Sequence, residues 1–161
     1  MPALNAVEPF MNKPVPPVFG ADTRRFELPD LDRHATWFMP RFIAAFPHLN
    51  ERQAIGFLRS VLYSSEYLFL FQEKGIALAQ TLGAHALEAQ TVIWERFVWV
   101  EDPQNEKQVE AASYFYERFA DWAKRKTVSN IVVEQNTDVP LELIRARLKR
   151  ITTVEQKVAR V

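Results

Sequence analysis

Three strand-like segments follow one another in the middle of the chain, and this run is the strongest constraint on the fold. They are EYLFLFQEKG (66–75), IALAQTLG (76–83) and LEAQTVIWERFVWVED (87–102), each rich in apolar residues and the first and third also in aromatic ones. Gly75 and the stretch 83–85 supply short connections between them. Because short connections join antiparallel neighbours, the sequence predicts an antiparallel meander.

Helices are expected on both sides of this run, since apolar residues recur there at helical spacing. Asp30 or Asp32 is the expected N-cap of the first helix, and Asn50 that of the second. The predicted elements outside the run are a strand at 24–28, helices at 33–46, 51–64 and 106–126, a strand at 129–135, a helix at 141–150 and a strand at 152–161. The order β-α-α-β-β-β-α-β-α-β predicts one α+β domain over residues 24–161.

Residues 1–23 are predicted to form an extended arm in front of that domain. Prolines crowd this part of the chain, and proline removes a backbone donor and fixes φ. The arm also carries apolar side chains that a disordered linker normally avoids: Leu4, Val7, Phe10, Met11, Val15, Val18 and Phe19. Two interpretations stay open, a flexible tail and an arm that binds its own domain or a neighbouring subunit.

Composition argues against several classes of site and partner. The chain has no cysteine and three scattered histidines, so thiolate chemistry is excluded and no metal site is predicted. The formal net charge of zero argues against nucleic acid, and the basic residues near Arg145 are interpreted as a solvated helix face. No segment has the ~20 apolar residues of a membrane span, and the first residues lack a signal-peptide pattern. We therefore expect a cytoplasmic or virion location without membrane contact.

The order of elements resembles that of the GNAT acyltransferase superfamily, whose members carry acetyl groups from acetyl-CoA to amines. The resemblance covers roughly residues 24–161, and it includes the two helices after the first strand and the long strand before the long helix. It implies a mixed, largely antiparallel twisted sheet flanked by helices. In that family, backbone amides in the turn after the long strand bind the pyrophosphate of CoA, and glycine there lets the anion approach.

The corresponding turn of this chain lacks those glycines. The family pattern is Arg or Gln, two residues, Gly, one residue, then Gly or Ala. Counted from Gln104, the glycine positions hold Lys107 and Val109; counted from Gln108, they hold Ala111 and Ser113. Acidic side chains surround the turn, and like charges disfavour a polyphosphate. They are Glu101, Asp102, Glu106 and Glu110.

If acetyl-CoA does bind, the resemblance assigns its contacts to five residues of this chain. They are Val100, Gln104, Lys107, Gln108 and Asn136. A glutamate on the long strand deprotonates the substrate amine in some members, and Glu95 is the best-placed candidate here, followed by Glu88. A solvent-facing surface position is the alternative interpretation of Glu95. The family often uses a tyrosine on the helix after the fifth strand as acid, but no tyrosine follows Tyr116.

These departures favour a non-catalytic structural or interaction protein that has the GNAT fold and needs no cofactor. We expect the arm to bind a protein partner or a second copy of the chain. GNAT-like proteins of this size resemble ones encoded among the late genes of tailed bacteriophages, and this resemblance favours a virion component of the head, the head–tail junction or the tail. The alternative is an acetyl-CoA-dependent N-acetyltransferase.

Overall fold

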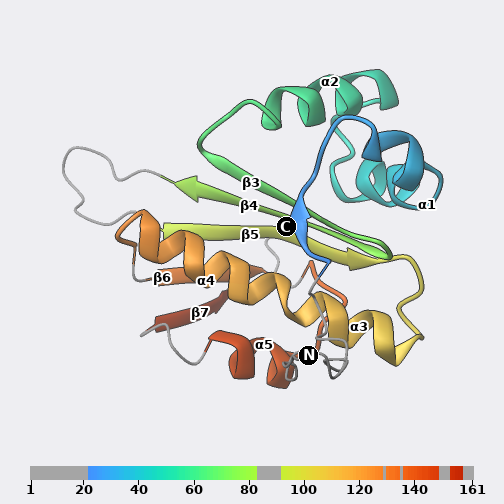
Figure 1. Ribbon diagram of the computed structural model, residues 1–161. Coiled ribbons are helices and arrows are strands. Elements are labelled where there is room, and N and C mark those ends of the chain that lie inside the picture. The colour runs from blue at the N-terminus through green and yellow to red at the C-terminus, as the bar shows by residue number, and fades with distance from the viewer. Residues whose placement is uncertain (1–21, 83–91, 129, 135, 149–152, 158–161) are drawn as a thin grey trace, which may run out of the picture.

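The computed structural model describes residues 22–82, 92–128, 130–134, 136–148 and 153–157. Within these ranges, a six-stranded sheet lies between two groups of helices (Figure 1). One group, α1 and α2, covers one face of the sheet, and α3, α4 and α5 cover the other. The predicted α+β fold is confirmed. Among the described residues, no helix has both the length and the apolar character that a membrane crossing requires.

Neighbouring strands are antiparallel in one half of the sheet and parallel in the other. The elements are β2 (Arg24–Arg25), α1 (Asp30–Ala45), α2 (Glu51–Val61), β3 (Tyr67–Gln72), β4 (Gly75–Leu82), β5 (Val92–Val100), α3 (Glu106–Ser113), α4 (Phe115–Arg125), β6 (Asn130–Glu134), α5 (Leu141–Leu148) and β7 (Thr153–Lys157). In the sheet order β2-β3-β4-β5-β6-β7, the pairs up to β4–β5 are antiparallel, and β5–β6 and β6–β7 are parallel. The mixed, largely antiparallel sheet is as expected. The predicted connection at 83–85 lies outside the described residues.

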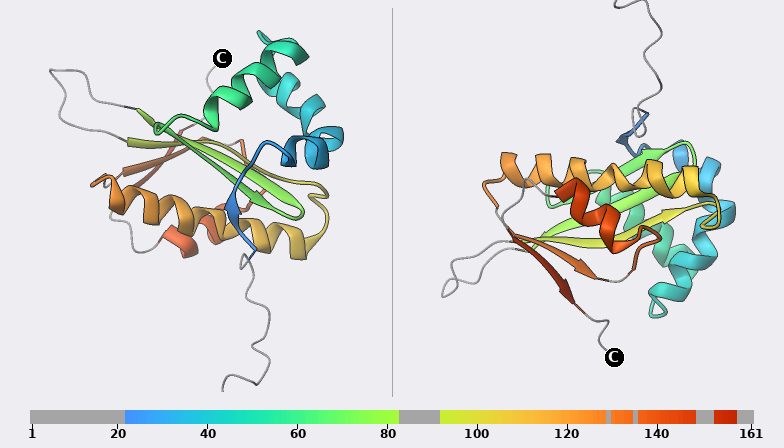
Figure 2. Two further views of the ribbon diagram at one scale, coloured as in Figure 1. Left: turned by 45° about the horizontal axis from the view of Figure 1, so that its top comes forward. Right: turned by 90° about the horizontal axis from the view of Figure 1, so that it is seen from below.

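Strand β3 is apolar on both faces because helices cover both faces of the sheet. Leu68 and Leu70 belong to the core beneath α3, α4 and α5, whereas Phe69 and Phe71 belong to the core beneath α1 and α2. Seen from below (Figure 2, right), α3 and α4 follow each other along one face and α5 lies beside them. Two layers of helices therefore bury side chains that alternate along each central strand.

A β-bulge in β5 changes this alternation. Leu78 of β4 lies opposite Phe97, but the next residue, Ala79, lies opposite Glu95, so Arg96 is an extra residue without a partner in the register. The extra residue brings Arg96 and Phe97 to the same face, the one covered by α1 and α2. Glu95 points to the opposite face, where it meets Tyr116 of α4.

The long helix predicted over 106–126 is two helices, α3 and α4, which meet at Tyr114. The side chain of Gln72 on β3 donates to the carbonyl of Ala111 at 2.8 Å. The amide of Tyr114 also donates to this carbonyl, at 3.1 Å, which is an i to i−3 hydrogen bond of the 3₁₀ type. A side chain that enters the helical hydrogen-bond ladder is a recognised cause of a break. Sequence periodicity carries no signal for it, because Gln72 is remote in the chain.

The expected N-cap is confirmed for α2 and is wrong for α1. Asn50 and Gln53 form a reciprocal capping box at the start of α2. Asp30 is instead the first residue of α1, and its carboxylate accepts two hydrogen bonds from Arg24 at 2.8 and 2.9 Å and one from the amide of Glu27 at 2.8 Å. Burial raises the pKa of Asp30, but the bonds from Arg24 and Glu27 outweigh burial and leave that pKa below its usual value.

The α1–α2 core should depend strongly on Phe97, which is fully buried and stacks on Trp99 with ring centroids 4.2 Å apart. We expect Phe97→Ala to lower the free energy of unfolding by about 3–5 kcal/mol, because it removes a buried ring and leaves a cavity. Tyr63→Ala is the matched control, since Tyr63 is 84% exposed and its loss should cost no more than about 0.5 kcal/mol. Urea denaturation measures both changes, and similar losses in the two variants would contradict this assignment of the core.

Candidate functional site

The turn between β5 and α3 satisfies most of its own backbone amides. The side-chain oxygen of Asn105 accepts from the amides of Lys107 at 3.0 Å and Gln108 at 3.3 Å. The carboxylate of Asp102 accepts from the amide of Gln104 at 3.1 Å, and the side chain of Gln108 accepts from the amide of Asp102 at 2.8 Å. Amides that would face an anion at a helix N-terminus therefore already have acceptors from the chain itself.

An open pocket of about 340 Å³ lies beside this turn, and its lining carries charges of both signs. Lys74 and Lys107 are its cations, and Asp22 and Glu73 are its acids. Lys74 also forms an exposed ion pair with Glu101 at 3.4 Å. The predicted contacts Lys107 and Gln108 thus do reach a common pocket, but its charge is mixed and does not favour a polyphosphate.

β5 and β6 stop pairing after Glu95 and Val133, and residues 136–138 close the gap that follows by pairing with β5 at Val98. The two strands pair in register from Val92 opposite Asn130 to Glu95 opposite Val133. Further along β5, the amide of Val98 donates to the carbonyl of Asn136 at 3.2 Å, and the amide of Asp138 donates to the carbonyl of Val98 at 2.9 Å.

Side chains of the same segment bond to the rest of this edge. The amide of Val100 donates to Asp138 Oδ2 at 2.9 Å, and Asn136 Nδ2 donates to the carbonyl of Arg96 at 3.1 Å. Trp99 Nε1 also donates to Asn136 Oδ1, at 3.2 Å. The predicted contacts Val100 and Asn136 therefore do lie together, and they bond within this closed edge.

Arg41 of α1 holds Asp138 in this position. Its two terminal nitrogens donate to the two carboxylate oxygens at 2.8 and 2.6 Å, a bidentate arrangement. The guanidinium also lies 4.6 Å from the ring centroid of Trp99. Asp138 is 9% exposed in its side chain, so the pair is partly withdrawn from water. Helix α1 thereby fastens the 136–138 segment to the edge of β5.

Glu95 lies in a buried hydrogen-bond chain with Tyr116 and Thr137. Tyr116 donates to Glu95 Oε2 at 2.6 Å, Thr137 donates to the Tyr116 oxygen at 2.9 Å, and the amide of Val139 donates to Thr137 Oγ1 at 3.1 Å. Burial, followed by the carboxylate of Glu95, raises the pKa of Tyr116 well above its usual value. Glu95 has no exposed surface, so the solvent-facing interpretation of this residue is wrong.

This arrangement limits what Glu95 can do as a base. A general base must come within hydrogen-bond reach of the proton that it removes. Here the carboxylate reaches a phenol in the core beneath α4, and Tyr116 is itself fully buried. Glu88, the second candidate, lies outside the described residues. No cluster of three or more His, Cys, Asp or Glu side chains that could hold a metal occurs in the part of the chain that the structure describes.

Sequence reasoning missed Arg41, Tyr116 and Asp138. Arg41 and Asp138 are 97 positions apart, and nothing local marks either as half of a pair. Tyr116 lies on the apolar side of α4 and is fully buried next to Phe115 and Phe119. Its position one helical turn after Ala112 was the available signal, because a tyrosine in a buried stripe needs a polar partner.

Comparison with known proteins identifies the fold. No protein-family model and no curated protein sequence matches the chain. Among solved structures, the aminoglycoside 6'-N-acetyltransferase AAC(6')-Ig of Acinetobacter haemolyticus superposes with a TM-score of 0.52 at 13% identity, covering 86% of this chain and 93% of that one. The aminoglycoside N-acetyltransferase AAC(6')-Iy, solved with CoA, gives 0.54 at 13% identity, covering 87% and 90%. An acetyltransferase of Vibrio fischeri gives 0.50 at 14% identity, covering 77% and 98%.

At these identities the likeness establishes the fold alone. The resemblance inferred from the order of elements is confirmed at that level: the chain has the GNAT acetyltransferase fold.

Proposed function

We propose that the chain is a structural or interaction protein on a GNAT fold and that it does not transfer acetyl groups from acetyl-CoA. The observation that carries the proposal is the closed gap between β5 and β6. The amides of Val98 and Val100 and the carbonyls of Arg96 and Val98 are bonded to residues 136–138. A ligand laid along this edge would have to displace that segment.

Opening the gap carries a free-energy cost that can be bounded. A neutral hydrogen bond contributes about 0.5–1.5 kcal/mol net, and one to a charged group about 1.5–3 kcal/mol. The segment makes three neutral bonds to the β5 backbone, and its Asp138 carboxylate accepts from Val100 and Arg41. Together they amount to roughly 5 kcal/mol or more. A cost of ~5.5 kcal/mol lowers an apparent affinity by about 10⁴-fold. The turn before α3, whose backbone amides already have acceptors within the chain, would add to this cost.

The N-terminal arm is the proposed interaction element, with a protein partner or a second copy of the chain as its target. Its apolar residues, from Leu4 to Phe19, lie outside the described residues. The described chain begins next to a firm attachment, since Thr23 accepts through its hydroxyl from Gln72 and through its carbonyl from Arg118, each at 2.8 Å. A tailed-bacteriophage virion is the proposed setting, supported by the composition of the arm.

The second candidate is an acetyl-CoA-dependent N-acetyltransferase. The fold shared with solved acetyltransferases, one of them a CoA complex, supports it. In this candidate the cofactor contacts are the five residues predicted from the sequence, and Glu95 is the base. Both roles require the 136–138 segment to move, because Val100 and Asn136 bond within the closed edge and Glu95 is buried.

Acetyl-CoA binding separates the two candidates. Isothermal titration calorimetry of the full chain with millimolar acetyl-CoA should show no saturable heat, because the backbone groups that would receive the cofactor are already bonded. AAC(6')-Iy, which has been solved with CoA, is a suitable positive control. A dissociation constant in the micromolar range would favour the acetyltransferase and overturn the first proposal.

The buried state of Tyr116 can be tested by spectrophotometric titration of the phenolate. A free tyrosine ionises near pH 10, and burial beside Glu95 keeps Tyr116 neutral beyond that value. Wild type and Tyr116→Phe should therefore give equal phenolate absorbance through the range around pH 10 in which exposed tyrosines ionise. An excess of one tyrosine in the wild type would show that the Glu95–Tyr116 pair opens to solvent, as the acetyltransferase requires.

The same pair predicts a pH dependence of stability. The pKa of Tyr116 is higher in the folded state than in the unfolded state. The contribution of Tyr116 to the free energy of unfolding is therefore complete below about pH 10 and declines above it. The free energy of unfolding of the wild type should therefore fall more steeply above that pH than that of Tyr116→Phe. Parallel curves would contradict the raised pKa.

The arm is tested by deletion of residues 1–21, which leaves the Thr23 attachment in place. We expect the truncated chain to keep its circular dichroism spectrum and to lose the oligomeric mass of the full chain in light scattering. Loss of apolar contacts at positions such as Phe10 and Phe19 is the physical reason. A mass per particle that is monomeric for both chains, or unchanged by the deletion, would contradict self-assembly through the arm.

A further inference from the structure

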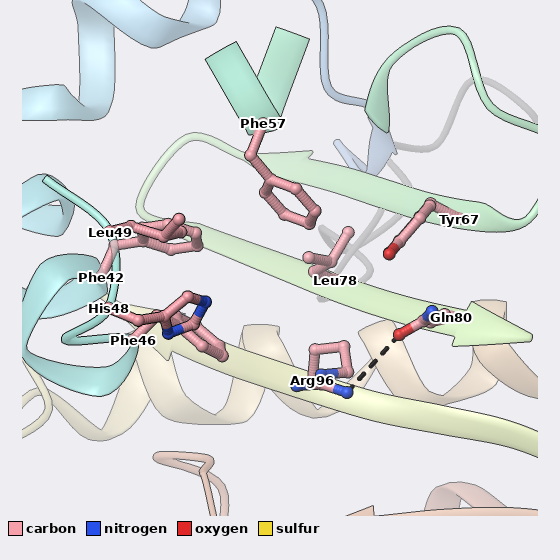
Figure 3. Close-up of a pocket in the computed structure, with 9 residues that line it drawn as sticks. All are labelled: Phe42, Phe46, His48, Leu49, Phe57, Tyr67, Leu78, Gln80 and Arg96. Atoms are coloured by element: carbon pink, nitrogen blue, oxygen red, sulfur yellow. Dashed lines mark hydrogen bonds between the residues drawn. The ribbon is translucent and has the colours of Figure 1, made fainter. Parts of the chain in front are cut away.

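A second pocket lies on the opposite face of the sheet from the Glu95–Tyr116 pair. It has a volume of about 250 Å³ and is enclosed by α1, α2 and the loop between them, above β4 and β5 (Figure 3). Its walls are largely aromatic, from Phe42, Phe46, Phe57 and Tyr67. This volume lies just below the range of roughly 300–1,000 Å³ for ligand sites, so the pocket has room for one aromatic ring with a short side chain.

Arg96 is the fixed charge of this pocket. The β-bulge turns its side chain toward the pocket, where its terminal nitrogen donates to Gln80 Oε1 at 3.5 Å, as the dashed line in Figure 3 marks. Its guanidinium lies 4.6 Å from the ring centroid of Trp94 and 5.9 Å from that of Phe46. A guanidinium has five N–H donors, and one long hydrogen bond uses little of that capacity.

Two other arginines that pack against aromatic rings, Arg24 and Arg41, have a carboxylate partner, whereas Arg147, which lies over Tyr114, donates to the hydroxyl of Ser113. Arg24 lies over Phe71 and pairs with Asp30 at 2.8 Å, and Arg41 lies over Trp99 and pairs with Asp138 at 2.6 Å. Among the described residues, no acidic residue lines the pocket and no carboxylate comes within 4.0 Å of Arg96. The pocket therefore presents a largely aromatic wall, the polar side chains of His48 and Gln80, and a cation whose counter-ion is not supplied by the described chain.

We propose that this pocket binds a small carboxylate whose apolar body is about the size of one aromatic ring. The ring lies among Phe46, Phe57 and Tyr67, and the carboxylate receives hydrogen bonds from Arg96. A planar guanidinium suits a carboxylate because it donates two parallel bonds. An amine is disfavoured, since the described lining offers it a cation and no acid. The proposal is independent of acetyl-CoA, because the pocket lies across the sheet from Tyr116 and away from the turn before α3.

Three probes of one shape test the charge requirement: 3-phenylpropionate, 3-phenylpropanol and 3-phenylpropylamine. Each is titrated against the full wild-type chain and followed by calorimetry and by ligand-observed NMR. We expect the carboxylate to bind at least about tenfold more tightly than the alcohol, as loss of a charged hydrogen bond predicts, and the amine to bind most weakly. No binding of the carboxylate at millimolar concentration, or equal binding of all three probes, would overturn the proposal.

Two substitutions locate the site. Arg96→Gln should weaken 3-phenylpropionate binding by about tenfold or more and leave the alcohol unchanged. Arg52→Gln is the matched control, because Arg52 is an exposed arginine on α2 that does not line the pocket, and it should bind like the wild type. An Arg96→Gln variant that binds the carboxylate normally would contradict the assignment.

A separate measurement in the wild type locates the site even if Arg96→Gln misfolds. Intermolecular NOEs in the wild type should connect the ring of 3-phenylpropionate to Phe57 and to the methyl groups of Leu78, which both line the pocket. Contacts to other parts of the protein, with none to these two residues, would overturn the site even if the carboxylate binds.

Discussion

The bulge at Arg96 is the constraint on which both the Glu95–Tyr116 pair and the aromatic pocket depend. Without the extra residue, strict alternation would place Glu95 and Phe97 on one face of the sheet. With it, Phe97 remains in the α1–α2 core while Glu95 reaches Tyr116 beneath α4. Arg96 joins Phe97 on the α1–α2 side and enters the aromatic pocket. One irregular residue thus places a carboxylate in one core and a cation against the other.

The closed gap beside β5 shows how the chain itself satisfies the backbone groups at the end of strand pairing. Parallel strands that diverge expose amides and carbonyls, and these groups must find partners in water, in a ligand or in the chain. Here Asn136 and Asp138 supply them, and Arg41 neutralises the Asp138 charge. The same bonds that stabilise the domain therefore compete with any molecule that would lie along this edge.

Local signals predicted much of the fold, and long-range contacts account for what was missed. The capping box at Asn50 is local, and so is the alternation along β3, and both could be found from neighbouring residues. The break at Tyr114 depends on Gln72 from β3, and the segment that closes the gap is held in place by Arg41 from α1. The burial of Glu95 follows from a bulge whose position no nearby residue marks. Contacts of this kind are set by the assembled sheet, so sequence periodicity cannot reveal them.

The arginines on the α1–α2 side of the sheet differ in how their charges are satisfied, and this difference connects fold to function. On the α1–α2 side, Arg24 and Arg41 each hold a carboxylate of the chain, which fixes them and leaves them little capacity for a ligand. Arg96 packs against rings in the same way, yet within the described chain only an amide oxygen accepts from it. A half-buried guanidinium gains most from an anionic partner when it lies among apolar side chains, because the local dielectric is low. The preference of a guanidinium for a carboxylate holds Asp138 at the edge of β5. The same preference favours an anionic ligand beside Arg96 in the aromatic pocket.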